Sequence, residues 1–142
     1  RNCTLRNTDN GVRVKTWRGS PPSAATNINF DDIVMENVKN PIIIDQEYCA
    51  EGGNCRGNVA SKVKLSNINF RNIRGTSRSK NAIRIRCSKE FPCQNVQTFN
   101  IDLKYLDTSS PVPLPALSEC AHVKVGTGGI QNPPPCMLMA NT

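Results

Sequence analysis

A short element recurs along this chain of 142 residues. Asn27-Ile28-Asn29-Phe30 returns as Asn67-Ile68-Asn69-Phe70, and an Ile follows each copy three residues later. A weaker copy of this first element spans 99–103. A second element, an Asn followed by alternating apolar positions, occurs three times, at 10–14, 40–44 and 81–85. Long-range self-similarity built from short strands is typical of a solenoid. The repeat therefore predicts an all-β chain folded as a parallel β-helix, in preference to a sandwich of similar strands.

The composition supports strands and divides the chain. Val and Ile together number 21 against seven Leu, and β-branched residues favour strands over helices. The 17 Asn fit the turns of such a solenoid, because Asn tolerates the left-handed backbone. Six of the ten Pro lie beyond residue 110, and Pro removes ladder donors. We therefore expect β-helix coils over residues 1–106 and a loop-rich, disulfide-tied cap, without further regular coils, over residues 107–142.

The seven cysteines indicate an oxidising compartment and a secreted protein. Close spacing in the chain favours three disulfides among the several pairings that six cysteines allow: Cys49–Cys55, Cys87–Cys93 and Cys120–Cys136. Cys3 is left over, and we expect it to pair with a cysteine upstream of this chain. Zinc is disfavoured, because the chain has no C-x2-C motif and a single His. Asn2-Cys3-Thr4 is a candidate glycosylation sequon.

The net charge of +7 predicts a polyanionic partner. Nucleic acid is disfavoured because the chain lacks a recognisable binding motif and is only 5% aromatic. A membrane span is disfavoured because the longest apolar run, Ile42-Ile43-Ile44, is far shorter than the ~20 residues needed. No signal segment opens the chain, so we expect a mature product or a fragment. Composition alone does not choose between an anionic membrane surface and an acidic polysaccharide as the partner.

Two outward cations are the first candidate site. In a strand that buries Val12 and Val14, Arg13 and Lys15 point out together and can hold a carboxylate, sulfate or phosphate. An ordinary solvated strand face is the alternative, since Arg84 and Arg86 repeat the pattern. One repeat later, Asp45 and Glu47 share the outward side; they suit either neighbouring cations, a general acid/base pair or part of a calcium site. Tyr48 suits either sugar stacking or a turn anchor.

A family resemblance rests on these segments. Asn10-Gly11-Val12-Arg13-Val14-Lys15-Thr16 closely resembles the Asn-Gly-Val-Arg-Ile-Lys-Thr motif of polygalacturonases, glycoside hydrolase family 28. Residues 42–49, 72–77 and 87–93 resemble the plant branch, and the pollen branch in particular. The resemblance covers residues 2–136. It implies a right-handed parallel β-helix that hydrolyses α-1,4-galacturonan with inversion, without a cofactor or metal. It also implies that Arg13 and Lys15 grip the substrate carboxylate beside the scissile bond, and that Tyr48 is the active-site Tyr.

The departures from the family pattern concern catalysis. The family places Asn-Thr-Asp, Gly-Asp-Asp and Gly-His-Gly motifs before the Arg-x-Lys motif. Here Asn7-Thr8-Asp9 abuts it, Asp31-Asp32 follows it without the Gly, and His122 lacks Gly neighbours. We therefore expect a C-terminal part of a polygalacturonase that carries one wall of the substrate cleft and is inactive alone. The alternatives are a non-catalytic, uronate-binding cell-wall module and, less favoured, a calcium-dependent pectate lyase.

Overall fold

A computed structural model describes residues 1–49, 55 and 59–136 of the chain, and all regular structure among them is β-strand. None of the described residues forms a helix that is long and apolar enough to cross a membrane. The strands are β1 (Cys3–Arg6), β2 (Asn10–Trp17), β3 (Ser23–Val38), β4 (Asn40–Tyr48), β5 (Val63–Ser77), β6 (Asn81–Arg86), β7 (Cys93–Tyr105), β8 (Leu114–Pro115), β9 (Leu117–Ala121) and β10 (Val123–Asn132).

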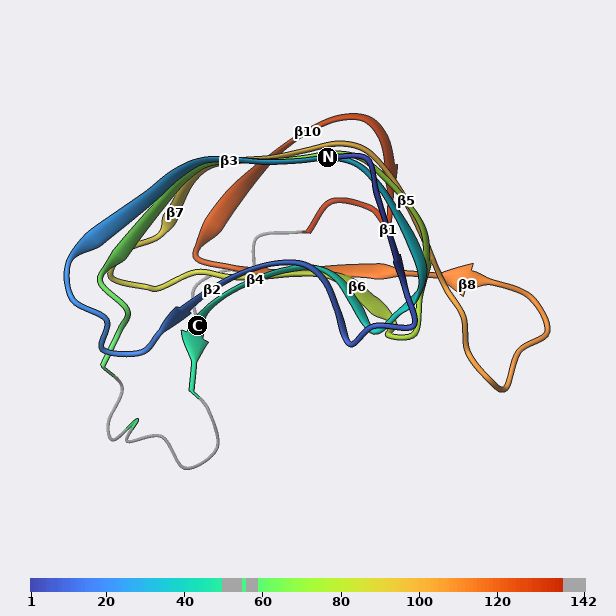
Figure 1. Cartoon of the computed structure of the whole chain (residues 1–142), viewed down its shortest axis with the longest axis horizontal. Coiled ribbons are helices and arrows are strands. Elements are labelled where there is room, and N and C mark those ends of the chain that lie inside the picture. Colours follow the sequence, from blue (N-terminus) through green and yellow to red (C-terminus); the bar gives the residue numbers. More distant parts are fainter. Residues whose placement is uncertain (50–54, 56–58, 137–142) are drawn as a thin grey trace.

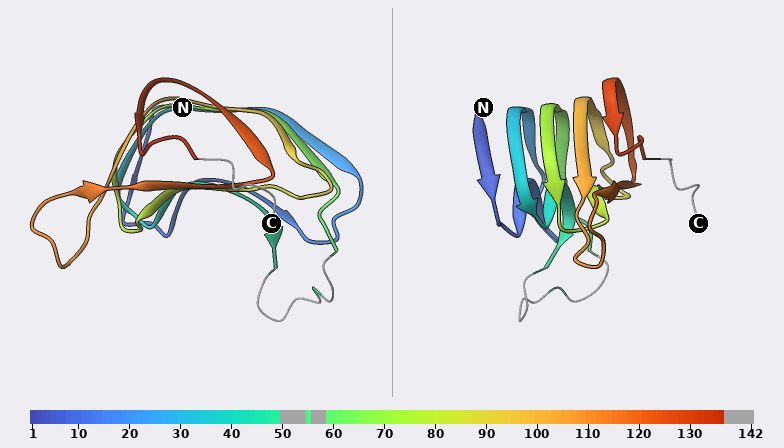
Figure 2. Two further views of the ribbon diagram at one scale, coloured as in Figure 1. Left: turned by 180° about the vertical axis from the view of Figure 1, so that it is seen from behind. Right: turned by 90° about the vertical axis from the view of Figure 1, so that its right-hand side faces the viewer.

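Alternate strands of the chain belong to different sheets. A six-stranded sheet has the order β1-β3-β5-β7-β10, with β8 pairing to β7, and a four-stranded sheet has the order β2-β4-β6-β9. The β7–β8 pair is antiparallel, and every other pairing among the described strands is parallel. The sheets form two layers in Figure 1, and the side view of Figure 2 shows successive coils stacked from the N-terminal end. This is the predicted parallel β-helix.

The repeats of the sequence set the register between coils. Ile28 pairs with Ile68 and Phe30 with Phe70, whose stacked rings have centroids 5.3 Å apart. The second element is aligned in the same way across β2, β4 and β6. The weaker copy at 99–103 lies on the same sheet but is displaced along it, since Ile101 pairs with Ile73 and the partner of Ile68 is Val96. The shared apolar face of these rungs forms the core.

Left-handed residues bend the long strands at stacked positions. Asn2, Asp32, Asn72 and Asn100 have φ between 52° and 56°, and they occupy equivalent places in successive coils. Asn tolerates this conformation because its short polar side chain can bond locally. Here the bonds also run between coils: Asn100 Nδ2 donates to Asn72 Oδ1 (3.3 Å), and Asn72 Nδ2 donates to Asp31 Oδ1 (3.0 Å). These polar ladders fix one coil against the next on the outside of the solenoid.

The C-terminal third differs from the prediction. Residues 107–136, the described part of the expected cap, include two strands of the solenoid: β9 pairs with β6 and β10 pairs with β7, which adds a coil. The prolines allow this because they gather in the 111–115 segment and at 133–135, before and after β9 and β10. The disulfides join Cys49 to Cys55, Cys87 to Cys93 and Cys120 to Cys136, as their spacing predicts, while Cys3 is exposed and free.

Candidate functional site

The outer face of the four-stranded sheet brings Arg13, Lys15 and Tyr48 together. The ring of Tyr48, at the end of β4, lies beneath both cations of β2: the Lys15 Nζ is 4.2 Å from the ring centroid and the Arg13 Cζ is 5.0 Å from it. A cation over an aromatic face within about 6 Å is attracted by the ring quadrupole. The Tyr48 ring therefore attracts both the Arg13 guanidinium and the Lys15 ammonium group, which lie next to each other on the surface.

The start of β2 explains why the motif begins with Asn-Gly. Asn40 Nδ2 donates to the carbonyl of Asp9 (3.1 Å) and to Asn10 Oδ1 (3.4 Å), which ties β2 to β4. A Cβ at Gly11 would lie 2.3 Å from the Pro41 carbonyl oxygen, so only Gly allows the strands to approach this closely here. Val12 next to it is buried in the core, so the alternation of the strand turns Arg13 outward.

Trp17 widens the aromatic surface. Its ring meets the Tyr48 ring edge to face, with centroids 4.8 Å apart and planes at 81°. The indole remains 45% exposed, although large apolar side chains normally bury more of their area. Exposed aromatic rings beside charged groups suit sugar rings, which have an apolar face and a polar rim. Trp17 lies one residue beyond the motif, and nothing in the sequence alone marks it as a site residue.

The cations of β2 differ from their neighbours in having no anionic partner. Among the described residues, no carboxylate lies within ion-pair distance of Arg13 or Lys15. Arg13 Nε is a buried donor with no acceptor in the described part of the chain. Native structures rarely leave such a donor unpaired, and ordered water commonly supplies the acceptor.

The nearest carboxylates on β4 are already engaged. Asp45 lies in register with Lys15, and its Oδ1 accepts a hydrogen bond from the backbone N–H of Glu47 (2.9 Å). Glu47 Oε2 is 4.0 Å from Arg18 Nη2, and Arg18 Nε donates to the Glu47 carbonyl (3.1 Å). No group of three or more metal-ligating side chains occurs among the residues that the structure describes. The geometry thus favours neighbouring cations as partners for Glu47 over a calcium role.

A second cationic pair lies two strands away on the same face. Arg86 on β6 donates from Nη2 (2.6 Å) and Nε (3.1 Å) to Glu119 Oε1 on β9, and this hydrogen bonding raises the pKa of Arg86 against the opposing effect of burial. Arg84 Nε lies 3.8 Å from Glu119 Oε2. Sequence parity predicted that Arg84 and Arg86 share this face, but nothing in the sequence linked them to Glu119.

The amino-acid sequence as a whole matches one enzyme family. The sequence model of Glycosyl hydrolases family 28 matches residues 1–128. The chain belongs to glycoside hydrolase family 28. A polygalacturonase from Gossypium hirsutum is 50% identical over 135 residues, which are 95% of this chain and 32% of that protein. An exopolygalacturonase from Platanus acerifolia is 50% identical over 131 residues, 92% of this chain and 33% of that protein.

A third relative extends the match to nearly the whole chain. A polygalacturonase from Nicotiana tabacum is 43% identical over 140 residues, 99% of this chain and 34% of that protein. The family 28 chain therefore spans about a third of the length of these relatives.

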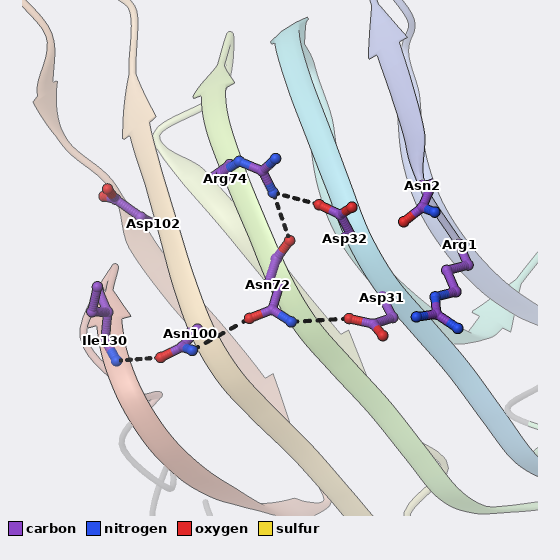
Figure 3. A pocket seen from close by; sticks show the side chains of 9 residues that line it. All are labelled: Arg1, Asn2, Asp31, Asp32, Asn72, Arg74, Asn100, Asp102 and Ile130. Carbon is purple, nitrogen blue, oxygen red and sulfur yellow. Dashed lines mark hydrogen bonds and ion pairs between the residues drawn. The ribbon is translucent and has the colours of Figure 1, made fainter.

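The acidic look-alikes of the family's catalytic motifs do not approach Tyr48. Asp31 and Asp32 belong to β3 of the other sheet, where they line a polar pocket of about 560 Å³ (Figure 3). Asp31 accepts from the Asn72 amide, and Asp32 Oδ1 receives Arg74 Nη1 at 2.8 Å. Asp9 pairs with Arg78 at 3.2 Å. In this family 28 chain these carboxylates tie coils together.

The remaining candidates lie outside the cationic face. His122 is an exposed residue with φ of 56° at the turn from β9 to β10. Asn2, the sequon residue, is exposed on the six-stranded sheet and lines the pocket of Figure 3, where Arg1 is its neighbour. Glycosylation of Asn2 therefore stays a prediction, as does the pairing of Cys3 with an upstream cysteine.

Proposed function

We propose that this chain forms the substrate-binding wall of a polygalacturonase, in which Arg13 and Lys15 bind the carboxylate of a galacturonate and Tyr48 orients them. The observation that carries the proposal is the convergence on one aromatic ring of two cations that have no carboxylate partner among the described residues. Membership of family 28 and the printed names of the relatives support polygalacturonate as the substrate.

The chemistry of the cluster suits a polyuronate. A carboxylate on each sugar offers two acceptor oxygens, and a guanidinium can meet both of them with a planar fork of N–H groups. Lys15 adds a compact second charge, which favours an ionised uronate over its neutral methyl ester. The exposed Trp17 ring provides an apolar surface for a pyranose face. These contacts bind and orient the substrate, and they leave protonation of the leaving group to other residues.

We assign the bond-breaking step to the longer protein. Inverting glycosidases use one carboxylic acid to protonate the leaving oxygen and a second carboxylate to activate water from the opposite side. Asp45 caps the Glu47 N–H and Glu47 faces Arg18, so neither is a good candidate for these roles. We propose that the catalytic carboxylates belong to the part of the relatives that this chain does not match, and that the 142-residue chain alone is inactive.

Product analysis tests the proposal. We expect the isolated chain to release no reducing ends from polygalacturonate, and the longer protein that carries it to release them. Turnover by the isolated chain would contradict the assignment of the catalytic groups. An unsaturated, ultraviolet-absorbing product that requires calcium would instead support a pectate lyase, and binding without turnover by the longer protein would support a non-catalytic module.

Binding tests the role of the cations. We expect Arg13→Gln and Lys15→Gln each to weaken polygalacturonate binding about tenfold or more, because each removes a charge-assisted contact. Binding should also weaken as salt screens the charges. Affinity that is unaffected by both substitutions would refute the proposed site. We also propose a secreted, cell-wall location, which the disulfides and the names of the plant relatives support.

A further inference from the structure

We propose that Arg84 on β6 forms a second carboxylate-binding position, which takes another uronate of the same polygalacturonate chain that Arg13 binds. The inference rests on the proposed function, since it assumes a polyuronate on this face. It assigns a specificity role to a residue that lies two strands from the Arg-x-Lys motif.

The register of the sheet places the two arginines in line. Arg13 pairs with Ile43, Ile43 pairs with Arg84, and Arg84 pairs with Glu119. Arg13 and Arg84 therefore occupy the same position in their coils, with the apolar Ile43 between them. Two strand spacings separate their backbones by about 9–10 Å, because neighbouring strands lie about 4.8 Å apart. This span is of the same order as two linked pyranose rings, so one oligomer can reach both arginines.

Each of the two arginines also has a hydrogen-bond donor without an acceptor among the described residues. Arg13 Nε and Arg84 Nε are each buried, and neither has an acceptor among the described residues. A buried donor of this kind costs free energy until an acceptor arrives. The Arg84 side chain is 34% exposed, so an anion in solution can reach the guanidinium. A uronate carboxylate can accept from the solvent-facing N–H groups of the guanidinium at either position.

Glu119 leaves Arg84 available because its oxygens are used elsewhere. Its Oε1 receives both hydrogen bonds from Arg86, and its Oε2 receives the Asn81 amide at 3.3 Å. Arg84 has an ion-pair contact of 3.8 Å to Oε2 and forms no hydrogen bond with it. The Glu119 carboxylate thus lies between two guanidinium groups. It forms hydrogen bonds with Arg86 and none with Arg84, so the charge of Arg84 is only partly compensated.

A second carboxylate position has a consequence for specificity. A chain bound at Arg13 and Arg84 must carry free carboxylates on two sugars, so methyl esterification of either sugar weakens binding. Affinity should therefore rise from galacturonate to trigalacturonate, and Arg84 should account for part of that rise. A bulk electrostatic attraction predicts no such dependence on one residue.

The test titrates galacturonate and trigalacturonate into the purified 142-residue chain, followed by NMR chemical shifts. We expect Arg84→Gln to weaken trigalacturonate binding about fivefold while leaving galacturonate binding unchanged, whereas Arg13→Gln weakens both. Arg71→Gln is the matched control, because Arg71 is exposed on β5 of the other sheet and its loss changes the net charge equally. Glu119→Gln provides a gain-of-function arm: it removes the negative charge 3.8 Å from Arg84 and should strengthen trigalacturonate binding.

The outcomes separate the two proposals. Equal weakening by Arg84→Gln and Arg71→Gln would overturn the second position in favour of general charge. A loss on Arg13→Gln with no effect of Arg84→Gln would overturn the inference and leave the proposed function standing. Absence of any trigalacturonate binding by the unaltered chain would overturn both. Circular dichroism of each variant verifies that the fold is retained, and the Glu119→Gln arm decides the matter if Arg84→Gln does not fold.

Discussion

The ammonium group of Lys15 lies 4.2 Å from the centre of the Tyr48 ring, on the neighbouring strand of the same sheet. The Arg13 guanidinium approaches the same ring at 5.0 Å. One aromatic side chain thus compensates in part for the repulsion between two like charges, with no carboxylate needed. An acidic partner would have occupied the cations and competed with the proposed uronate.

Replacement of the Tyr48 ring should therefore weaken substrate binding. We expect Tyr48→Ala to reduce affinity for trigalacturonate about tenfold, because both cations lose an attraction of roughly 0.5–2 kcal/mol and the freedom of their long side chains increases. Tyr48→Phe keeps the ring and should stay within about threefold of the unaltered chain. Calorimetric titration measures both. Equal losses in Phe and Ala would mean that the hydroxyl, and not the ring, carries the effect.

Gly11 sets the distance between β2 and β4. Gly11→Ala should reduce the free energy of unfolding by about 1–3 kcal/mol, because the new Cβ would overlap the fixed Pro41 carbonyl oxygen. The matched control is Gly126→Ala on β10, where the nearest atom, Gln97 Cγ, is at an ordinary 3.4 Å; its change should stay within about 0.5 kcal/mol. Urea unfolding compares the two. A tolerated Gly11→Ala would show that the strands can separate.

The ladder on the six-stranded sheet allows a test that separates backbone from side chain. Asn72 has φ of 52° and bonds both neighbouring coils, so Asn72→Gly should cost the amide bonds, about 1–2 kcal/mol. Asn72→Ala should cost about 1 kcal/mol more, because Ala also strains the left-handed backbone. At Asn69, which bonds Asn29 at 2.9 Å from ordinary strand backbone, the order should reverse. The same order at both positions would contradict this account.

Gln46 joins three segments inside the solenoid. Its side chain is 1% exposed, its Nε2 donates to the Val63 carbonyl (2.8 Å), and its Oε1 accepts the Ser88 N–H (2.9 Å). Gln46→Leu should lower the unfolding free energy by about 2–4 kcal/mol, because a buried N–H and a buried carbonyl lose their partners. The exposed Gln94→Leu serves as the control, with a change expected within about 0.5 kcal/mol. Equal midpoints in urea would refute this role.

Periodicity in the sequence was sufficient to predict the solenoid, the register of its rungs and the outward side of Arg13, Lys15, Arg84 and Arg86. Each of these follows from alternation within a strand and from repetition between coils, which are local properties. The displaced position of Phe99-Asn100-Ile101 relative to the first element is also a consequence of using local pattern alone. Asn72-Ile73 and Asn67-Ile68 are equally good local matches for it, and only pairing in space distinguishes them.

Contacts between side chains of distant segments could not be predicted from the sequence. Gln46 follows Ile42 and Ile44 on the inward side, but its partners lie 17 and 42 residues away. Glu119 reaches Arg86 across 33 residues, from a segment whose prolines predicted loops. The cations and Tyr48 were candidates from strand alternation and from the resemblance, whereas their convergence on one ring is a property of the packed sheet.

The ladders also bear on how such a chain changes over evolutionary time. Equivalent asparagines are 30 residues apart at Asn7 and Asn37, 40 apart at Asn27 and Asn67, and 28 apart at Asn67 and Asn95, although all remain bonded in register. The paired strands thus keep their register although the number of residues per coil varies. The additional residues lie in the connections that follow Trp17, Tyr48 and Arg86. Because these connections begin at the edge of the face that carries Arg13 and Lys15, insertions there can change the rim of the proposed binding surface without moving the two cations.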